Sequence, residues 1–130
     1  MLGQREPEIY GSDTLDDIKG MCHEACETLG FSMDFRQSNH EGELVTWIQD
    51  AKGTIDALVI NAGAYTHTSV AIHDALKLMD IPIIEVHISD PKTREEFRHH
   101  SYIEPVAADI VTGEGPKGYV LALEKLAKLL

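Results

Sequence analysis

Two of the seven histidines stand at or after the ends of short apolar runs, where a parallel sheet places its reactive side chains. His87 directly follows residues 81–86, and His67 lies in the loop that Asn61 begins. An imidazole can give or take a proton near neutral pH. Neither histidine has the cysteine neighbours or the H-E-x-x-H spacing of a zinc site, so we expect no metal. The pattern favours acid–base or hydrogen-bonding work, although a strand-end histidine can also be purely structural.

A short segment near the N-terminus contains an arginine and a tyrosine, Arg5 and Tyr10, between polar and turn-forming residues. A nearby guanidinium would lower the pKa of the phenol from its ordinary value of about 10, so that the phenolate could act as a base. The alternative is that both side chains lie on the surface without a catalytic role. The segment taken alone favours this alternative.

Residues 94–102 hold two arginines and two histidines. Guanidinium groups match carboxylates in bidentate geometry, so the segment predicts carboxylate capture. The alternative is a charged helical turn that forms its own salt bridges. The glycines of residues 113–118 lack the spacing of a phosphate loop, and no lysine lies in an apolar run where it could form a Schiff base.

Composition narrows the class of protein. The chain has 130 residues, of which 43% are hydrophobic and 25% charged, and this predicts one domain over residues 1–130. The net charge of −11 argues against nucleic-acid and anionic-membrane partners. We expect no signal peptide, no membrane span and a cytoplasmic location, in which Cys22 and Cys26 are reduced, buried apolar side chains.

Helical and strand-like patterns alternate along the chain. Helices are predicted from Thr14 to Gly30, across Leu44 to Ala51, across Ser69 to Met79, and from about Lys117, with a short helical turn at 94–97. Strands are predicted at 31–37, 57–60, 81–86 and 106–111. In the third helix, Val70, Ala71, Ala75, Leu76 and Met79 are expected to face inward. The order predicts an α/β fold with a parallel sheet between helices, whose first strand, before Thr14, is missing from this chain.

Five segments in order resemble the type II 3-dehydroquinate dehydratases. They are residues 2–11 (LGQREPEIYG), 37–43 (QSNHEGE), 61–71 (NAGAYTHTSVA), 85–89 (EVHIS) and 94–102 (REEFRHHSY). The resemblance implies a flavodoxin-like three-layer αβα fold, a dodecamer built from trimers, and a lyase reaction of the shikimate pathway. It implies trans-dehydration of 3-dehydroquinate through an enolate, with no cofactor, imine or metal.

The resemblance also implies roles for residues at matching positions. Tyr10 would be the base, Arg5 would keep it ionised, and His87 would be the general acid with Glu85 supporting its ring. The implied substrate-binding residues are Asn61, His67, Arg98, the backbone N–H groups of Ile88 and Ser89, and Asp74 from a neighbouring subunit.

The chain departs from the family pattern at two places. Asp90 stands where family members usually have asparagine, which adds a negative charge beside the carboxylate pocket unless it is paired. The family's leading strand and G-P-N-L-N-like turn are expected to be missing, and loss of an oxyanion donor typically costs roughly 10²–10³ in rate. Two alternatives are an inactive fragment of the same family and a flavodoxin-like binding module, which would bind flavin or nucleotide.

Overall fold

A parallel sheet of three strands forms the centre of the structure. The computed structural model describes residues 14–130, in which β1 (Leu58–Ile60), β2 (Ile83–Val86) and β3 (Asp109–Val111) lie in the order β1-β2-β3. All four residues of β2 are buried, as a central strand covered on both faces requires. The predicted parallel sheet is therefore confirmed.

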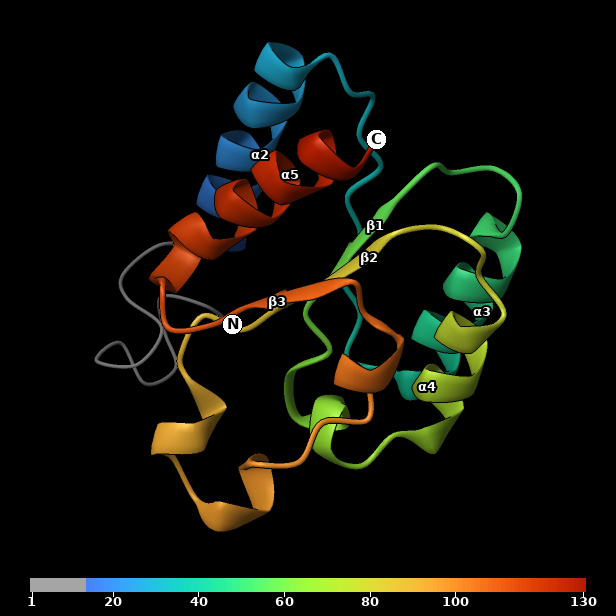
Figure 1. The fold of residues 1–130 in the computed structure, drawn as a ribbon, viewed down its shortest axis with the longest axis vertical. Helices are drawn as coiled ribbons and strands as arrows, with labels where there is room; N and C mark the ends of the chain where they lie inside the picture. The colour runs from blue at the N-terminus through green and yellow to red at the C-terminus, as the bar shows by residue number, and fades with distance from the viewer. Residues whose placement is uncertain (1–13) are drawn as a thin grey trace.

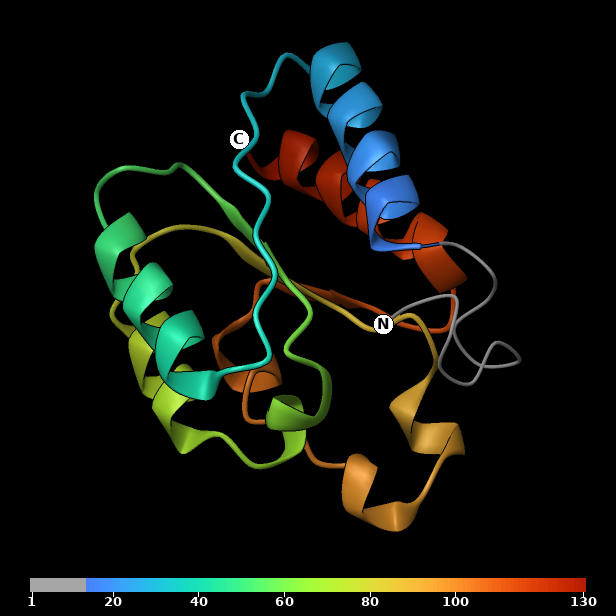
Figure 2. The ribbon, with the colours of Figure 1, turned by 180° about the vertical axis from the view of Figure 1, so that it is seen from behind.

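Helices cover both faces of this sheet (Figure 1). On one face α5 (Gly118–Leu129) packs on the strands, and α2 (Leu15–Leu29) packs against α5. On the other face lie α3 (Glu41–Ala51) and α4 (Val70–Lys77), as the reverse view in Figure 2 also shows. Within residues 14–130, no helix combines the length and the apolar character needed to cross a bilayer.

Helix α2 has the predicted ends. The Thr14 hydroxyl accepts a hydrogen bond from the Asp17 N–H, and the Asp17 carboxylate accepts one from the Thr14 N–H. At the other end Gly30 has a φ of +81°, the left-handed conformation that ends helices.

The prediction of a strand at 31–37 is wrong. Its apolar alternation is present, because Met33 and Phe35 pack towards Ile18 and Cys22 on α2. However, these residues form no ladder with another strand among those described. A strand requires backbone partners as well as a half-buried side-chain pattern, and the pattern alone cannot supply them.

Other predicted boundaries moved. Ser69 caps α4 by accepting from the Ile72 N–H, and the buried stripe is Ile72, Ala75, Leu76 and Met79. Val70 and Ala71 are exposed, contrary to prediction, because they lie in the first turn on the solvent side.

Five short 3₁₀ turns complete the described fold: η1 (Gly63–His67), η2 (Pro91–Thr93), η3 (Glu96–Arg98), η4 (Glu104–Val106) and η5 (Gly115–Lys117). The predicted strand at 106–111 is thus shorter, and the predicted turn at 94–97 lies one to two residues later.

Candidate active site

A buried acid–base pair lies where β2 ends. Glu85 belongs to β2, and His87 is the first residue after the strand ends at Val86. Residues two apart on an extended chain point to the same side, so the two side chains meet. The His87 Nε2–H donates to the Glu85 Oε2 over 2.5 Å, with Glu85 wholly buried and His87 7% exposed. The His87 Nδ1 atom is therefore the nitrogen left for another partner.

A third side chain contacts the same carboxylate oxygen. The Ser101 hydroxyl donates to the Glu85 Oε2 over 2.8 Å. The other oxygen, Oε1, is buried and has no hydrogen-bond partner among the residues described. The His87 ring and the Ser101 hydroxyl therefore donate to the same carboxylate oxygen.

The His67 ring lies almost parallel to that of His87, with centroids 6.3 Å apart and 16° between the planes. Its Nδ1–H donates to the His100 carbonyl over 2.8 Å, because a carbonyl oxygen can only accept. In the neutral ring the His67 Nε2 atom is then an acceptor. The two loop histidines predicted as a pair are thus brought together.

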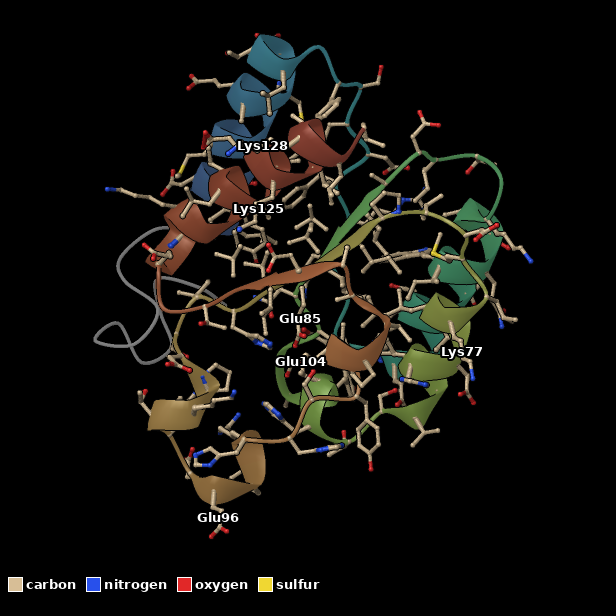
Figure 3. The ribbon with its side chains drawn as sticks, in the orientation of Figure 1. Lys77, Glu85, Glu96, Glu104, Lys125 and Lys128 are labelled. Carbon is tan, nitrogen blue, oxygen red and sulfur yellow. The ribbon has the colours of Figure 1, made fainter. Side chains whose placement is uncertain are left out.

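These groups line a cavity of about 260 Å³, near the low end of the range for small-molecule pockets. Figure 3 shows Glu85 and Glu104 close together below the sheet, in the region that the 3₁₀ turns enclose. The polar residues that line the cavity are His67, His87, His99, Arg98, Lys92, Glu85, Asp90, Glu104, Ser101 and Thr112.

A larger hollow of about 440 Å³ lies between β3 and α5. Its charged lining includes Lys125 and Lys128, both labelled on α5 in Figure 3, and Lys125 is paired with Asp109 at 2.9 Å. It contains no imidazole and no buried acid–base pair, so we assign the chemistry to the smaller cavity. Among residues 14–130, no three acidic, histidine or cysteine side chains gather as metal ligands would.

The arginine segment forms its own ion pairs and also reaches the cavity. The Arg98 Nε–H donates to Glu95 over 2.8 Å, and Arg94 lies 3.9 Å from the same carboxylate. The pKa of Glu95 is lowered, first by a backbone hydrogen bond and then by these guanidinium groups. Both sequence interpretations of this segment therefore have support, since Arg98 lines the cavity while paired.

The Asp90 side chain is hydrogen-bonded to the backbone of its own loop. Its Oδ1 atom accepts from the Lys92 N–H over 3.0 Å and caps η2. Its Cβ atom also lies 3.6 Å from where a side chain on Gly113 would begin, and Gly113 has a φ of +71°. The carboxylate therefore holds the loop while lining the cavity.

Asn61 lies beside the cavity lining but not within it. Its Nδ2–H donates to the Tyr119 hydroxyl over 2.8 Å, and its Oδ1 accepts from the Gly63 N–H over 3.0 Å. Burial raises the pKa of Tyr119, and the hydrogen bond from Asn61 partly opposes this. One N–H of the Asn61 amide remains for a further acceptor.

The remaining predicted site residues are less closely gathered. Ile88 is buried and Ser89 half-buried directly after His87, and Asp74 is exposed on α4. Their predicted contacts with substrate stay predictions. Arg5 and Tyr10 lie outside the described residues.

Sequence reasoning missed the contacts of Ser101 and of His73. Ser101 stands in a segment singled out for its arginines and histidines, and a serine gives no periodic signal. His73 on α4 is half-buried, and its Nδ1–H donates to the Tyr102 carbonyl over 2.6 Å. Both depend on contacts 16 and 29 residues apart, which no local pattern reveals.

Comparison with known proteins identifies the family of the chain. A 3-dehydroquinate dehydratase of Streptomyces avermitilis is 55% identical over 99% of this chain and 82% of its own length. The protein named 3-dehydroquinate dehydratase 1, from Agrobacterium fabrum, is 53% identical over 99% of this chain and 89% of its own length. The crystal structure of the type II dehydroquinase from Propionibacterium acnes superposes with a TM-score of 0.93 at 43% identity, over 98% of this chain and 88% of that one. Since residues 1–127 also match the family profile described as dehydroquinase class II, the chain belongs to the type II dehydroquinase family.

Proposed function

We propose that this chain catalyses the trans-dehydration of 3-dehydroquinate to 3-dehydroshikimate, with His87 as the general acid. The observation that carries the proposal is the buried Glu85–His87 pair on the cavity of a chain whose curated relatives bear that activity in their names. The substrate is a small anion, and the cavity contains the cationic side chains of Arg98 and Lys92.

The reaction removes a proton and a hydroxyl from adjacent carbons. Tyr10, kept ionised by Arg5, takes the proton beside the ketone and leaves an enolate. The enolate then re-forms the ketone as the C–O bond breaks, and the departing hydroxyl receives a proton from the His87 Nδ1 and leaves as water. The product has a carbon–carbon double bond conjugated with the ketone. No electrons are exchanged with any other molecule, so the atoms and charges balance without a co-reactant.

The other predicted residues would hold the substrate. Asn61, His67 and Arg98 contact its hydroxyls, and the N–H groups of Ile88 and Ser89 receive its carboxylate. Of these, His67 and Arg98 line the cavity with His87. In a dodecamer of trimers, Asp74 would reach a neighbouring subunit's site from the exposed face of α4. Sedimentation velocity on the purified chain tests that assembly.

The direct test follows ultraviolet absorbance as 3-dehydroquinate is converted to a conjugated enone. We expect turnover that borohydride does not inhibit, because no imine forms. Tyr10→Phe and His87→Ala should each nearly abolish it. Full activity in either variant would remove that residue from the mechanism, and absence of activity in the unmodified chain would contradict the function.

A further inference from the structure

We propose that Ser101 is a positioning residue that holds the Glu85 carboxylate directed at His87. The inference rests on the proposed function, because it matters only if His87 is the acid. Neither the sequence motifs nor the proposed mechanism gives the Ser101 hydroxyl a role.

The hydrogen bonds of Ser101 leave its hydroxyl one orientation. A serine hydroxyl has one hydrogen to donate and two lone pairs that accept. The Ser101 Oγ accepts from the Ile103 N–H over 3.1 Å and from the Glu104 N–H over 3.0 Å. Both lone pairs are thus occupied, and the single hydrogen points to the Glu85 Oε2 over 2.8 Å. Ser101 can only donate to that oxygen.

The backbone on either side of Ser101 is held in place from two other elements. The His100 carbonyl accepts from the His67 Nδ1–H, and the Tyr102 N–H donates to the Thr66 carbonyl over 2.9 Å, both in η1. The Tyr102 carbonyl accepts from His73 on α4. The hydroxyl is therefore presented by a fixed segment.

The Glu85 Oε2 atom accepts both of these hydrogen bonds only in the carboxylate form. A proton on Oε2 would displace one of the two donors, Ser101 or His87. A proton on Oε1 would create a buried O–H with no acceptor among the residues described, since Oε1 is buried and has no partner there. The carboxylate form keeps both donors bonded to Oε2 and places no hydrogen on the enclosed Oε1.

The consequence for His87 is a fixed ring. Because the Glu85 carboxylate can only accept a hydrogen bond, the His87 Nε2 atom must carry a hydrogen in both the charged and the neutral ring. The proton given to the leaving hydroxyl then comes from Nδ1, and the ring need not turn between cycles. Ser101 thereby acts through Glu85 and touches no reacting atom.

The first test replaces the hydroxyl. We expect Ser101→Ala to lower kcat by about 10- to 100-fold, the range for loss of a hydrogen bond to a charged group, with KM within about twofold. Ser101→Cys keeps the volume but donates weakly, so it should behave like Ser101→Ala, whereas Ser101→Thr should restore most of kcat. Thr14→Ala is the matched control, because it also removes a hydroxyl that caps a backbone N–H, outside the cavity, and should leave kcat unchanged.

The second test is a double-mutant cycle. In the Glu85→Gln background, loss of the Ser101 hydroxyl should change kcat by less than about threefold, because the charge through which it acts is gone. Equal losses in both backgrounds, or unchanged kcat for both Ser101→Ala and Ser101→Cys, would overturn the proposal. If His87→Ala retains full activity, the proposed function fails instead. If His87→Ala is inactive while Ser101→Ala is fully active, only the proposed role of Ser101 is contradicted.

Discussion

The Nε2 atom of His87 lies 2.5 Å from the Oε2 atom of Glu85, and the carboxylate is wholly removed from solvent. A buried carboxylate needs its hydrogen-bond partners, because water cannot replace them. The pair therefore holds its geometry in the absence of substrate, and it gives the ring a fixed direction towards the cavity.

The first prediction concerns proton donation by this ring. His87→Asn should lower kcat by about 10²- to 10⁴-fold, the usual contribution of a positioned general acid, as measured by initial rates of enone formation. The matched control is His23→Asn, since His23 is an exposed histidine on α2 that pairs only loosely with Glu27. A loss below tenfold for His87→Asn, or a similar loss in the control, would contradict the assignment.

The second prediction concerns substrate binding by Arg98. Arg98→Ala should raise KM by about 10- to 100-fold, because a charge-assisted contact with the substrate is lost, and kcat should change less. Arg36→Ala is the control: Arg36 also forms an ion pair, with Asp34 at 3.0 Å, but it does not line the cavity. An unchanged KM for Arg98→Ala would show that its pairing with Glu95 is its whole function.

The third prediction concerns stability at alkaline pH. Burial raises the pKa of Cys22 from 9.0 to about 11, with a smaller contribution from Cys26. The folded state keeps its proton where the unfolded state has lost it, so this contribution to stability is complete below pH 9 and declines as the pH rises to about 11. The free energy of unfolding should fall by roughly 2–3 kcal/mol over that window.

Urea denaturation at several pH values measures this decline. In Cys22→Ala the fall between pH 9 and 11 should be clearly smaller, even though the variant is less stable throughout because a buried group has been removed. Tyr119, whose pKa burial also raises, contributes in both proteins only above about pH 10. Identical slopes in the two proteins would refute the prediction.

The fourth prediction concerns the support of Asn61. Tyr119→Phe removes the acceptor for the Asn61 Nδ2–H and should lower the free energy of unfolding by about 1 kcal/mol. If Asn61 holds the substrate, KM should rise as well, because the amide is then held only by the Gly63 N–H. Tyr65→Phe is the control, since its hydroxyl donates to the Asn39 carbonyl over 2.9 Å in an exposed contact, and KM should not change. An unaltered KM in both variants would argue that Asn61 is structural.

Much of this protein could be predicted from local patterns. The run at 81–86 predicted a buried parallel strand, and Asn61 and His87 were expected at one edge of the sheet because parallel strands all end there. The capping pair Thr14 and Asp17 also marked the start of α2. These features depend on residues close together in the chain, whose spacing carries the information.

Other features became visible only in three dimensions. The alternation at 31–37 is real, yet pairing depends on a neighbouring strand. Ser101 contacts Glu85, and His73 contacts Tyr102, across intervening loops. The sequence alone therefore determined the helices, the parallel strands and the residue types available for acid–base chemistry. The tertiary structure decided which of those side chains meet, because hydrogen bonds between distant segments depend on how the layers pack.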